Sequence, residues 1–439
     1  MGRNLNVNVE FLTRVEGHGN IVVNMKEGKL EKCELNIVEA PRLFESMVRG
    51  RSIFELPHIT SRICGICSCG HTLASIQAAE DALKYIPTKQ TVELRKLLLH
   101  LENLDSHILH IYMLAAPDML GKKSAFAMLE SNGGDVRRAL RMKKLCNDAC
   151  GVLVGRHVHP ISATVGGFTK LPDREALETI RHILMQIKRE LEPTLELAAG
   201  FKFPDFERDT EYVALTSGSE YAMLSGKVAS TDGINADKSE YRKVTNEFIV
   251  KHSTAKHAKL SRGSYMVGAL ARFNINSAKM SVSAKAAADA LGLKPVCRNP
   301  FLNTAAQLVE CFHFADDALV IVERFLEKGV EREQAVTVGL NERRDIDVRA
   351  GFGVGAVEVP RGLLFHAYEV DERGIVQKAD CVIPTGQNLQ NIEDDMAKLA
   401  GELGGKTDAE AELAFEMLVR AYDPCISCST HVVKVKCVR

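Results

Sequence analysis

Two cysteine pairs with the same spacing stand near opposite ends of the chain, and they constrain its fold more than any other feature. The first pair lies in "RICGIC" (62–67) and the second in "DPCISC" (423–428). This spacing lets both sulfurs of a pair turn toward one ion, and thiolates favour soft or borderline metals such as zinc, nickel or iron. Because loop entropy grows only logarithmically with length, the pairs can share a site if the core joins the two ends. The spacing alone predicts a tetrathiolate metal site, a structural zinc clip, or two unrelated pairs in a core.

Composition excludes several classes of protein. The 439 residues include 56 basic and 57 acidic side chains, and this balance gives no sign of a nucleic-acid surface. No apolar run is long enough to span a bilayer, and the start "MGRNLNVNVEF" has no signal core, so we expect a cytoplasmic protein. Twelve cysteines in such a chain are then reduced thiols or metal ligands, not a disulfide framework.

Hydrophobic periodicity predicts an α+β fold that is predominantly helical. Residues 6–40 alternate as strands around the turn "KEGK" and predict a hairpin. A long helical core element is expected over about 71–120, where leucines recur at three- and four-residue spacing. Further helices are expected at 136–155, 174–199, 280–292, 303–328, 388–403 and 408–421. Residues 350–383, rich in Val and Gly, predict strands, whereas the polar stretch 202–275 indicates no clear structure.

The chain has no Pro/Ser-rich linker and no internal repeat, so we expect one large domain over 1–439. A central bundle of long helices would form its core, with smaller β-rich regions at the periphery. The expected parts are a hairpin region (6–40), a helical core (about 71–330), a β-rich insertion (about 350–385), C-terminal helices with the second cysteine motif (388–431) and a short tail (432–439).

The residues around the cysteines carry a specific family resemblance. "RICGICSCGH" and "DPCISCSTH" resemble the first and last signature motifs of the large subunit of nickel-iron hydrogenases. Five further segments resemble that family's motifs in the same order, so the resemblance runs from about residue 10 to 431. They are "TRVEGHGN" (13–20), "RLFESMVRGR" (42–51), "GRHVHP" with the following "GG" (155–167), "VPRGLLFH" (359–366) and "CVIPT" (381–385).

The resemblance implies a binuclear centre that cleaves dihydrogen heterolytically. Cys64 and Cys425 would be terminal thiolates on nickel, while Cys67 and Cys428 would bridge nickel to an iron that carries carbon monoxide and cyanide. A terminal thiolate, expected to be Cys425, would pass its proton to Glu16. Taken without the cysteine motifs, Glu16 is more simply a solvated loop charge.

The same resemblance implies roles for the side chains around the metals. Arg361 would hold cyanide and polarise dihydrogen, with Asp423 as its partner, and Thr385 and the Pro360 backbone would complete the cyanide pocket. His71 would donate a hydrogen bond to a bridging sulfur. By themselves, Arg361 predicts a surface salt bridge and His71 a buried core histidine.

The resemblance also implies a magnesium ion held by Glu45, His431 and the backbone carbonyl of Cys381. Ser106 stands where some family members carry an acidic residue, and we assign it no role. "GFGVGA" (351–356) lacks the spacing of a nucleotide loop and predicts a glycine-rich turn. The cysteines outside the two pairs have no cluster-binding pattern and are expected to pack as small hydrophobic residues.

Since the chain has no iron-sulfur ligands of its own, the resemblance implies an iron-sulfur small subunit and further electron-transfer subunits. These subunits would decide whether the carrier is NAD(P), deazaflavin or a disulfide reductase. After nickel insertion, "VVKVKCVR" (432–439) would be either released or retained as a strand. Two alternatives are a zinc-stapled structural protein and the non-catalytic relative in respiratory complex I, which lacks the four cysteines.

Overall fold

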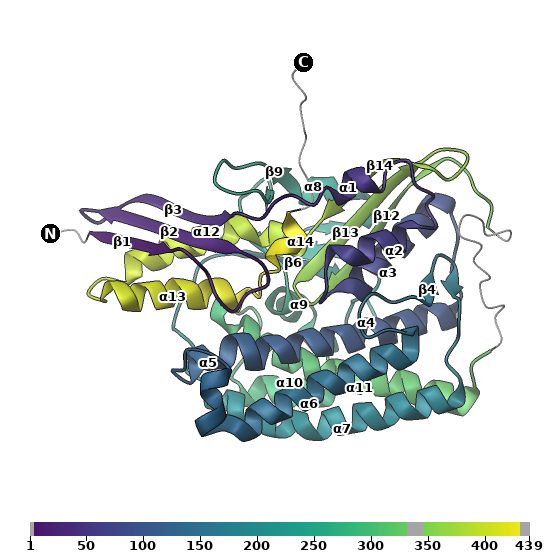
Figure 1. Cartoon of the computed structure of the whole chain (residues 1–439), viewed down its shortest axis with the longest axis horizontal. Coiled ribbons are helices and arrows are strands. Elements are labelled where there is room, and N and C mark those ends of the chain that lie inside the picture. Colours follow the sequence, from purple (N-terminus) through teal and green to yellow (C-terminus); the bar gives the residue numbers. More distant parts are fainter. Residues whose placement is uncertain (1–3, 332–345, 431–439) are drawn as a thin grey trace, which may run out of the picture.

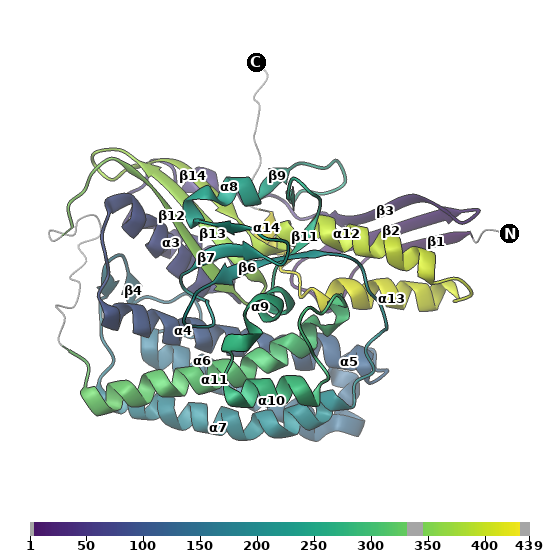
Figure 2. The same cartoon turned by 180° about the vertical axis from the view of Figure 1, so that it is seen from behind.

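Long helices pack side by side as one layer of the molecule, below the sheets and the cysteine motifs (Figures 1 and 2). The computed structural model describes residues 4–331 and 346–430. In the helical layer, α4 (Lys89–Leu109) contacts α6 (Leu129–Val154) and α11 (Asn303–Lys328), and both pack on α7 (Arg174–Ala199). The short α10 (Val282–Ala290) lies on α11. The predicted leucine stripe of α4 is buried in this layer, which confirms it as core.

The helical stretch predicted over 71–120 is not one continuous helix. It comprises α3 (Ser68–Leu83), α4, a π-helical turn (His110–Ala115) and α5 (Ala116–Met119). Lys84 adopts a left-handed conformation (φ 57°) that ends α3. Pro87 then disfavours helical geometry at the residue before it. The side chain of Thr88 accepts the backbone N–H of Thr91 at 3.1 Å and starts α4.

The N-terminal strands form a three-stranded antiparallel sheet of β1 (Leu5–Val9), β2 (Gly19–Lys26) and β3 (Lys29–Ile37). The predicted hairpin is its β2–β3 half. Glu27 and Gly28 at its turn both have positive φ, 50° and 79°, which is typical of a turn that matches the twist of the strands. α12 (Pro384–Glu402) packs on β3 and α13 (Asp408–Ala421) on β1.

A second antiparallel sheet, β12 (Gly351–Val359), β13 (Gly362–Val370) and β14 (Val376–Val382), lies against α3 (Figure 1). The prediction of a turn at "GFGVGA" is wrong, because these residues lie in β12. The reason is a stripe of alternating glycines, Gly351, Gly353 and Gly355, that faces the backbone of α3. A Cβ at Gly355 would lie 2.1 Å from the carbonyl oxygen of Ala74, so the helix approaches only because side chains are missing.

The stretch without a clear sequence signal, 202–275, consists of short strands joined by long irregular segments. A four-stranded sheet has the order β11-β6-β7-β8, with β6 at Glu211–Thr216, β7 at Lys227–Ser230, β8 at Asn235–Ala236 and β11 at Tyr265–Met266. Between β8 and β11 lies a hairpin of β9 (Asn246–Phe248) and β10 (His257–Lys259), and after β11 comes α9 (Ala269–Asn276). The short elements are α1 (Phe44–Met47), α2 (Leu56–Thr60), α8 (Tyr241–Val244), α14 (Ile426–Ser429), β4 (Ala163–Thr164) and β5 (Gly167–Phe168).

The predicted α+β class with a helical core is confirmed. Among the described residues, no helix combines the length and the apolar character that crossing a membrane requires.

Candidate metal centre

The two cysteine pairs meet in the interior of the molecule. The Sγ atoms of Cys64, Cys67, Cys425 and Cys428 all lie within 4.8 Å of one another, and all four residues are buried. Cys64 Sγ is 3.5 Å from Cys425 Sγ, and Cys67 Sγ is 4.0 Å from Cys428 Sγ. Four buried thiols at this spacing are a donor set for soft metals.

Backbone groups fix the first pair at the start of α3. Cys67 is the N-cap residue of this helix, and the backbone N–H groups of Ile66 and Cys67 both donate to Cys64 Sγ at 3.2 Å. The Arg42 guanidinium donates to the carbonyl of Ile63 at 2.6 Å and also to that of Ser427. One side chain therefore ties together the residues that directly precede Cys64 and Cys428.

The sulfurs divide into one that ionises readily and others that keep their protons. The hydrogen bond from Cys425, followed by those from Cys428 and Cys67, holds the pKa of Cys64 well below its ordinary value. Burial, in contrast, raises the pKa of Cys425 and of Cys428 well above theirs. Thiolate ligation at this centre therefore requires the Cys425 and Cys428 thiols to lose their protons.

Glu16 reaches the second pair from the N-terminal segment. Its Oε2 accepts from Cys425 Sγ at 3.0 Å and from the backbone N–H of Ser427 at 3.1 Å. Its carbonyl accepts the N–H of Ile426 at 2.9 Å, so both chain segments pair as in a parallel ladder. Gly17 follows with φ 89°, and a Cβ there would lie 2.7 Å from Ile426 Cβ. A close backbone approach therefore requires the glycine of "RVEG".

Arg361 and Asp423 form a buried ion pair beside the thiols. Arg361 donates to the Asp423 carboxylate at 2.8 Å and to its backbone carbonyl at 2.6 Å. Burial alone lowers the pKa of Arg361, but Asp423 and the cysteine thiolates outweigh it and raise that pKa well above its ordinary value. Arg361 also lies 3.4 Å from Ser106 Oγ, a contact that sequence reasoning left without a role. The guanidinium is therefore a fixed positive charge at the cluster.

A buried network that the sequence did not reveal holds the turn that carries Pro360 and Arg361. Arg272 of α9 donates to Glu310 at 2.6 and 2.7 Å and to Glu358 at 3.1 Å. It also donates to the carbonyls of Val359 and Pro360, at 2.8 and 3.2 Å. All three charged side chains are fully buried. No local spacing links these residues, which explains why the motifs gave no signal for them.

Thr385 contacts the second cysteine pair, whereas His71 contacts another histidine. The Thr385 hydroxyl oxygen accepts the backbone N–H of Cys425 at 2.9 Å, at the start of α12. The Nδ1 atom of His71 is 3.1 Å from His366 Nε2, and His366 continues to the hydroxyl of Tyr368 at 2.7 Å. This chain of polar groups runs from α3 into β13. The hydrogen bonds that the structure gives for the His71 ring lead to His366.

The residues predicted to hold magnesium are adjacent where they are described. Glu45 of α1 accepts the backbone N–H of Cys381 at 3.1 Å and lies 3.9 Å from the Lys256 ammonium. Burial raises the pKa of Glu45 to about 7. His431, the third predicted ligand, lies outside the described residues. Sequence reasoning did not identify Lys256, which stands in the hairpin between β9 and β10.

A further carboxylate that sequence reasoning did not identify, Glu102 of α4, stabilises the start of α3. It accepts the backbone N–H groups of Cys69 and Gly70 at 2.5 and 2.8 Å. Burial raises the pKa of Glu102 to about 8. Among the cysteines outside the two pairs, Cys69, Cys146, Cys150, Cys311 and Cys381 are buried, as expected for small core residues, and Cys33 and Cys297 are partly exposed, while Cys437 lies outside the described residues.

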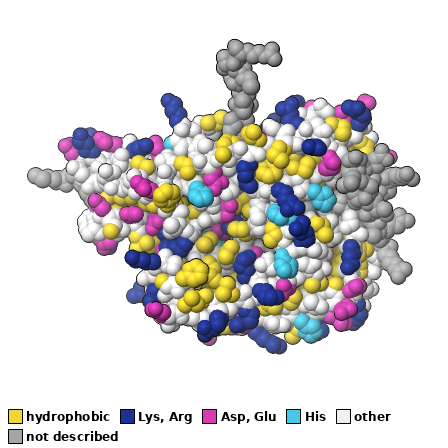
Figure 3. Space-filling model, viewed as in Figure 1, with side chains coloured by type: hydrophobic (Ala, Val, Ile, Leu, Met, Phe, Trp, Pro, Cys, Tyr) yellow, Lys and Arg dark blue, Asp and Glu magenta, His cyan; other side chains and the backbone are white. Residues whose placement is uncertain are grey.

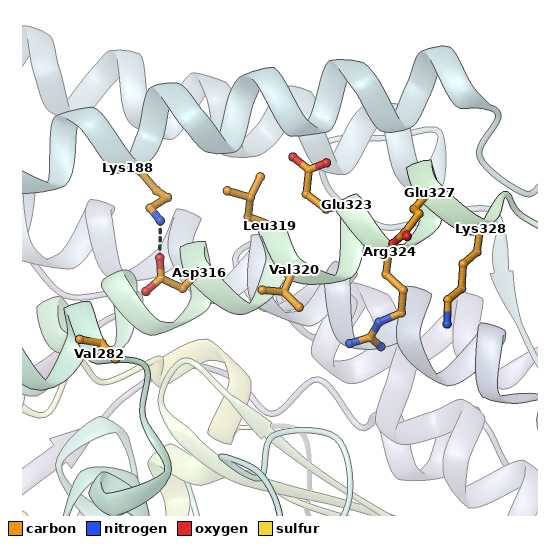
Figure 4. A pocket seen from close by; sticks show the side chains of 9 residues that line it. All are labelled: Lys188, Val282, Asp316, Leu319, Val320, Glu323, Arg324, Glu327 and Lys328. Carbon is orange, nitrogen blue, oxygen red and sulfur yellow. Dashed lines mark hydrogen bonds and ion pairs between the residues drawn. The ribbon is translucent and has the colours of Figure 1, made fainter.

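A surface hollow of about 730 Å³ between α7, α10 and α11 takes no part in this centre (Figure 4). In its lining, Lys188 forms an ion pair with Asp316, and Leu319 and Val320 supply apolar surface. None of the predicted site residues lines it.

The comparisons with known proteins agree with this geometry. The family described as "Nickel-dependent hydrogenase" matches residues 42–131 and 217–431, and the family "HoxL-like" matches residues 6–40. Sulfhydrogenase 1 subunit alpha of Pyrococcus furiosus is 32% identical over 98% of this chain and 99% of its own length. The NAD-reducing hydrogenase HoxS subunit beta of Cupriavidus necator is 26% identical, over 97% and 94%.

Solved structures show the same fold. The NAD⁺-reducing [NiFe]-hydrogenase in its H2-reduced state superimposes with a TM-score of 0.84 at 25% identity, covering 97% of this chain and 99% of that chain. The Ni-Fe-Se hydrogenase of D. vulgaris Hildenborough gives a TM-score of 0.76 at 21% identity over 98% of this chain and 100% of its own. Together with the four converging cysteines, these matches identify the chain as a large, catalytic subunit of the nickel-dependent hydrogenase family.

Proposed function

We propose that residues 1–439 form a single catalytic domain that cleaves dihydrogen reversibly into protons and electrons at a cysteine-bound nickel-iron centre. The observation that carries the proposal is the meeting of both cysteine pairs within 4.8 Å, with the Glu16 carboxylate 3.0 Å from Cys425 Sγ. Since the pairs come from opposite ends of the chain, neither end makes the site alone.

The donor set fits the metals of this family. Cys64 and Cys425 would hold nickel as terminal ligands, and Cys67 and Cys428 would bridge it to iron. The bound centre supplies open coordination positions at which dihydrogen is polarised and split. Thr385, whose oxygen accepts from Cys425 N–H, keeps its own hydroxyl hydrogen to donate to a cyanide ligand of the iron, beside the Pro360 backbone.

Glu16 is proposed to accept protons at the site, and Arg361 is proposed to supply a fixed positive charge. The Cys425 sulfur is already a hydrogen-bond donor to Glu16 Oε2, so a proton on this thiol has an acceptor in contact. Glu16 is partly exposed and can release the proton outward. Arg361, held by Asp423, keeps a positive charge where thiolate and cyanide charge gathers. His71 of α3, which contacts His366 of β13, is proposed to tune a bridging sulfur.

A magnesium ion is proposed next to Glu45 and the Cys381 backbone, with His431 as a further ligand. Carboxylate and carbonyl oxygens suit a hard cation. Lys256 already brings positive charge to Glu45, so magnesium has to coexist with this ammonium group. The expected result is that Glu45→Gln lowers magnesium content before it lowers nickel content.

Electrons need a partner, because the chain contributes no second cysteine cluster among its described residues. The relatives are named as subunits, and we propose an iron-sulfur small subunit with further electron-transfer subunits to a soluble carrier, in the cytoplasm. Phe11 and Val38, 75% and 60% exposed, line a hollow of about 260 Å³ beside the segment of Glu16. Hydrophobic side chains also appear between charged ones on the face in Figure 3. Such apolar groups suit a protein interface.

The deciding experiment is metal analysis combined with infrared spectroscopy of protein matured in its native host. Nickel and iron in equal amounts, with bands of metal-bound carbon monoxide and cyanide, are the expected result, together with dihydrogen-dependent dye reduction. Zinc alone, without such bands, would reduce the cysteines to a structural clip and refute the proposal.

A further inference from the structure

We propose that His252, His257 and Glu393 form a second metal site, specific for zinc or a similar divalent cation and separate from the four cysteines. Their ligand atoms all lie within 4.8 Å of one another. The two histidines come from the β9–β10 hairpin and the carboxylate from the middle of α12. This site does not depend on the proposed hydrogenase chemistry.

The donor geometry suits a small cation. His252 Nε2 lies 2.7 Å from Glu393 Oε1, and His257 Nε2 lies 3.5 Å from Glu393 Oε2. Zinc binds imidazole nitrogen at about 2.0–2.1 Å in a tetrahedron, which puts neighbouring donor atoms about 3.3 Å apart. An ion held by the three residues would replace the hydrogen bond between His252 and Glu393. The two histidines also show the spacing of four intervening residues that is common in zinc sites.

His257 supplies the strongest argument for a ligand. Its side chain is fully buried; within residues 4–331 and 346–430 its Nδ1 atom has no hydrogen-bond partner, and its Nε2 atom makes only a long contact of 3.5 Å with Glu393 Oε2. A buried polar group left in this state costs about 1–3 kcal/mol. The nitrogen nearest to Glu393 therefore approaches the carboxylate without the short contact of a strong hydrogen bond. A cation held between them would satisfy this nitrogen and the carboxylate at once.

The surrounding groups orient the ligands as they do in known metal sites. The backbone N–H of Leu35 in β3 donates to Glu393 Oε1 at 3.0 Å and fixes the carboxylate. His252 Nδ1 is 3.9 Å from Glu34 Oε1, so a second acidic group faces its other nitrogen. The Cys33 thiol donates to the carbonyl of Glu393 at 3.6 Å, and burial together with Glu393 raises its pKa to about 12. The thiol thus contacts the backbone of Glu393, and Cys33 is not among the three residues whose ligand atoms converge.

The exposure of His252 and the elements that carry the three ligands indicate a structural role for the ion. The His252 side chain is 20% exposed, so the site has access for the ion and for a water as fourth ligand. A bound ion would join the β9–β10 hairpin to β3 and α12. Lys256, directly before His257, contacts Glu45 and Glu247. The ion is therefore a structural staple that holds the hairpin carrying Lys256.

The test uses the full chain purified with its partner subunits, stripped with a mild chelator and then given one equivalent of Zn²⁺. Zinc-edge X-ray absorption should show a shell of nitrogen and oxygen only, at about 2.0–2.1 Å. His257→Gln and Glu393→Gln should each lose about one zinc per chain, while the exposed control His182→Gln retains it and all three keep their nickel. Added zinc should raise the Tm of wild type but not of His257→Gln.

Wild-type protein that retains no zinc would overturn the proposal. So would zinc with sulfur in its shell at about 2.3 Å, which would place the ion at cysteines. Because the absorption spectrum of wild type decides by itself, the test holds even if a variant fails to fold.

Discussion

Replacing Glu16 with Gln removes one proton acceptor and little else. The carboxylate accepts from Cys425 Sγ and from Ser427 N–H, at 3.0 and 3.1 Å. The Gln amide oxygen has the same position and still accepts the backbone N–H, so the pairing of Glu16 and Ile426 backbones persists. An amide cannot take up a proton from the thiol. The variant therefore separates the proton-accepting role of Glu16 from its structural role.

The size of the effect follows from the contact. A side chain positioned for direct proton transfer contributes about 10²–10⁴-fold to a rate, which corresponds to about 3–5 kcal/mol of barrier. Lost structure contributes little, because the variant keeps the hydrogen bond to Ser427. We therefore expect dihydrogen-dependent dye reduction to fall by about 10²–10⁴-fold in Glu16→Gln, with unchanged nickel, iron and infrared bands.

Two measurements and one control give the result its meaning. Dye reduction reports complete turnover, and exchange of dihydrogen with D2O reports proton release from the site, so both should fall together. Glu31→Gln, in an exposed position of the N-terminal hairpin, removes a carboxylate of equal charge and should match wild type. A fully metallated Glu16→Gln protein with activity within threefold of wild type would refute the assignment of Glu16 as proton acceptor.

Three further predictions follow from buried contacts. Thr385→Val leaves the N–H of Cys425 without its acceptor. We therefore expect the unfolding free energy to fall by about 1–3 kcal/mol and the infrared bands of cyanide to shift, and Thr385→Ser should restore both. Unshifted bands would exclude Thr385 from the iron pocket. Arg272→Met leaves Glu310 and Glu358 buried without their cation, and urea unfolding should show a loss of about 3–5 kcal/mol; an unchanged midpoint would show that the network does not hold the Pro360 turn. Burial lowers the pKa of His313 to about 4 from 6.5, so the unfolded chain binds the extra proton and wild-type stability falls as pH drops from about 6.5 to about 4. His313→Gln should abolish about 1.4 kcal/mol of this loss per pH unit, whereas the exposed His182→Gln should keep the wild-type slope; equal slopes for both would contradict a neutral buried His313.

The sequence identifies the parts of the site whose chemistry depends on residue type and short spacing. Two CxxC pairs predict thiolate ligands wherever the fold places them, and the leucine stripe of α4 predicts a buried helix for the same local reason. Glu16 is more difficult, because a lone glutamate in a loop has no distinguishing pattern. Its identification depends on the family motif around it, and the structure adds its contact with Cys425.

Interactions between distant segments leave no such pattern. Arg272 and Glu310 belong to different helices, and their pairing follows only from the packing of α9 on α11. The β structure in 202–275 is equally difficult, since its strands are short and β11 pairs with β6 from far along the chain. The proposed zinc triad combines both cases: the histidine spacing is visible in the sequence, but Glu393 enters from α12, more than a hundred residues later.

The glycine stripe of β12 has a consequence for how the centre tolerates change. Cys67 is the N-cap of α3, and β12 leads directly into Pro360 and Arg361. The distance between this helix and this strand therefore sets the position of the thiol relative to the guanidinium. Protein interiors transmit strain instead of absorbing it, and a shift of about 1 Å at a reacting group can cost about a hundredfold in rate. In laboratory evolution, Gly353 and Gly355 should therefore tolerate substitution as poorly as the cysteines do, although neither would contact metal or substrate. The missing Cβ atoms at these glycines allow the close approach of α3 and β12 on which the geometry of the centre depends.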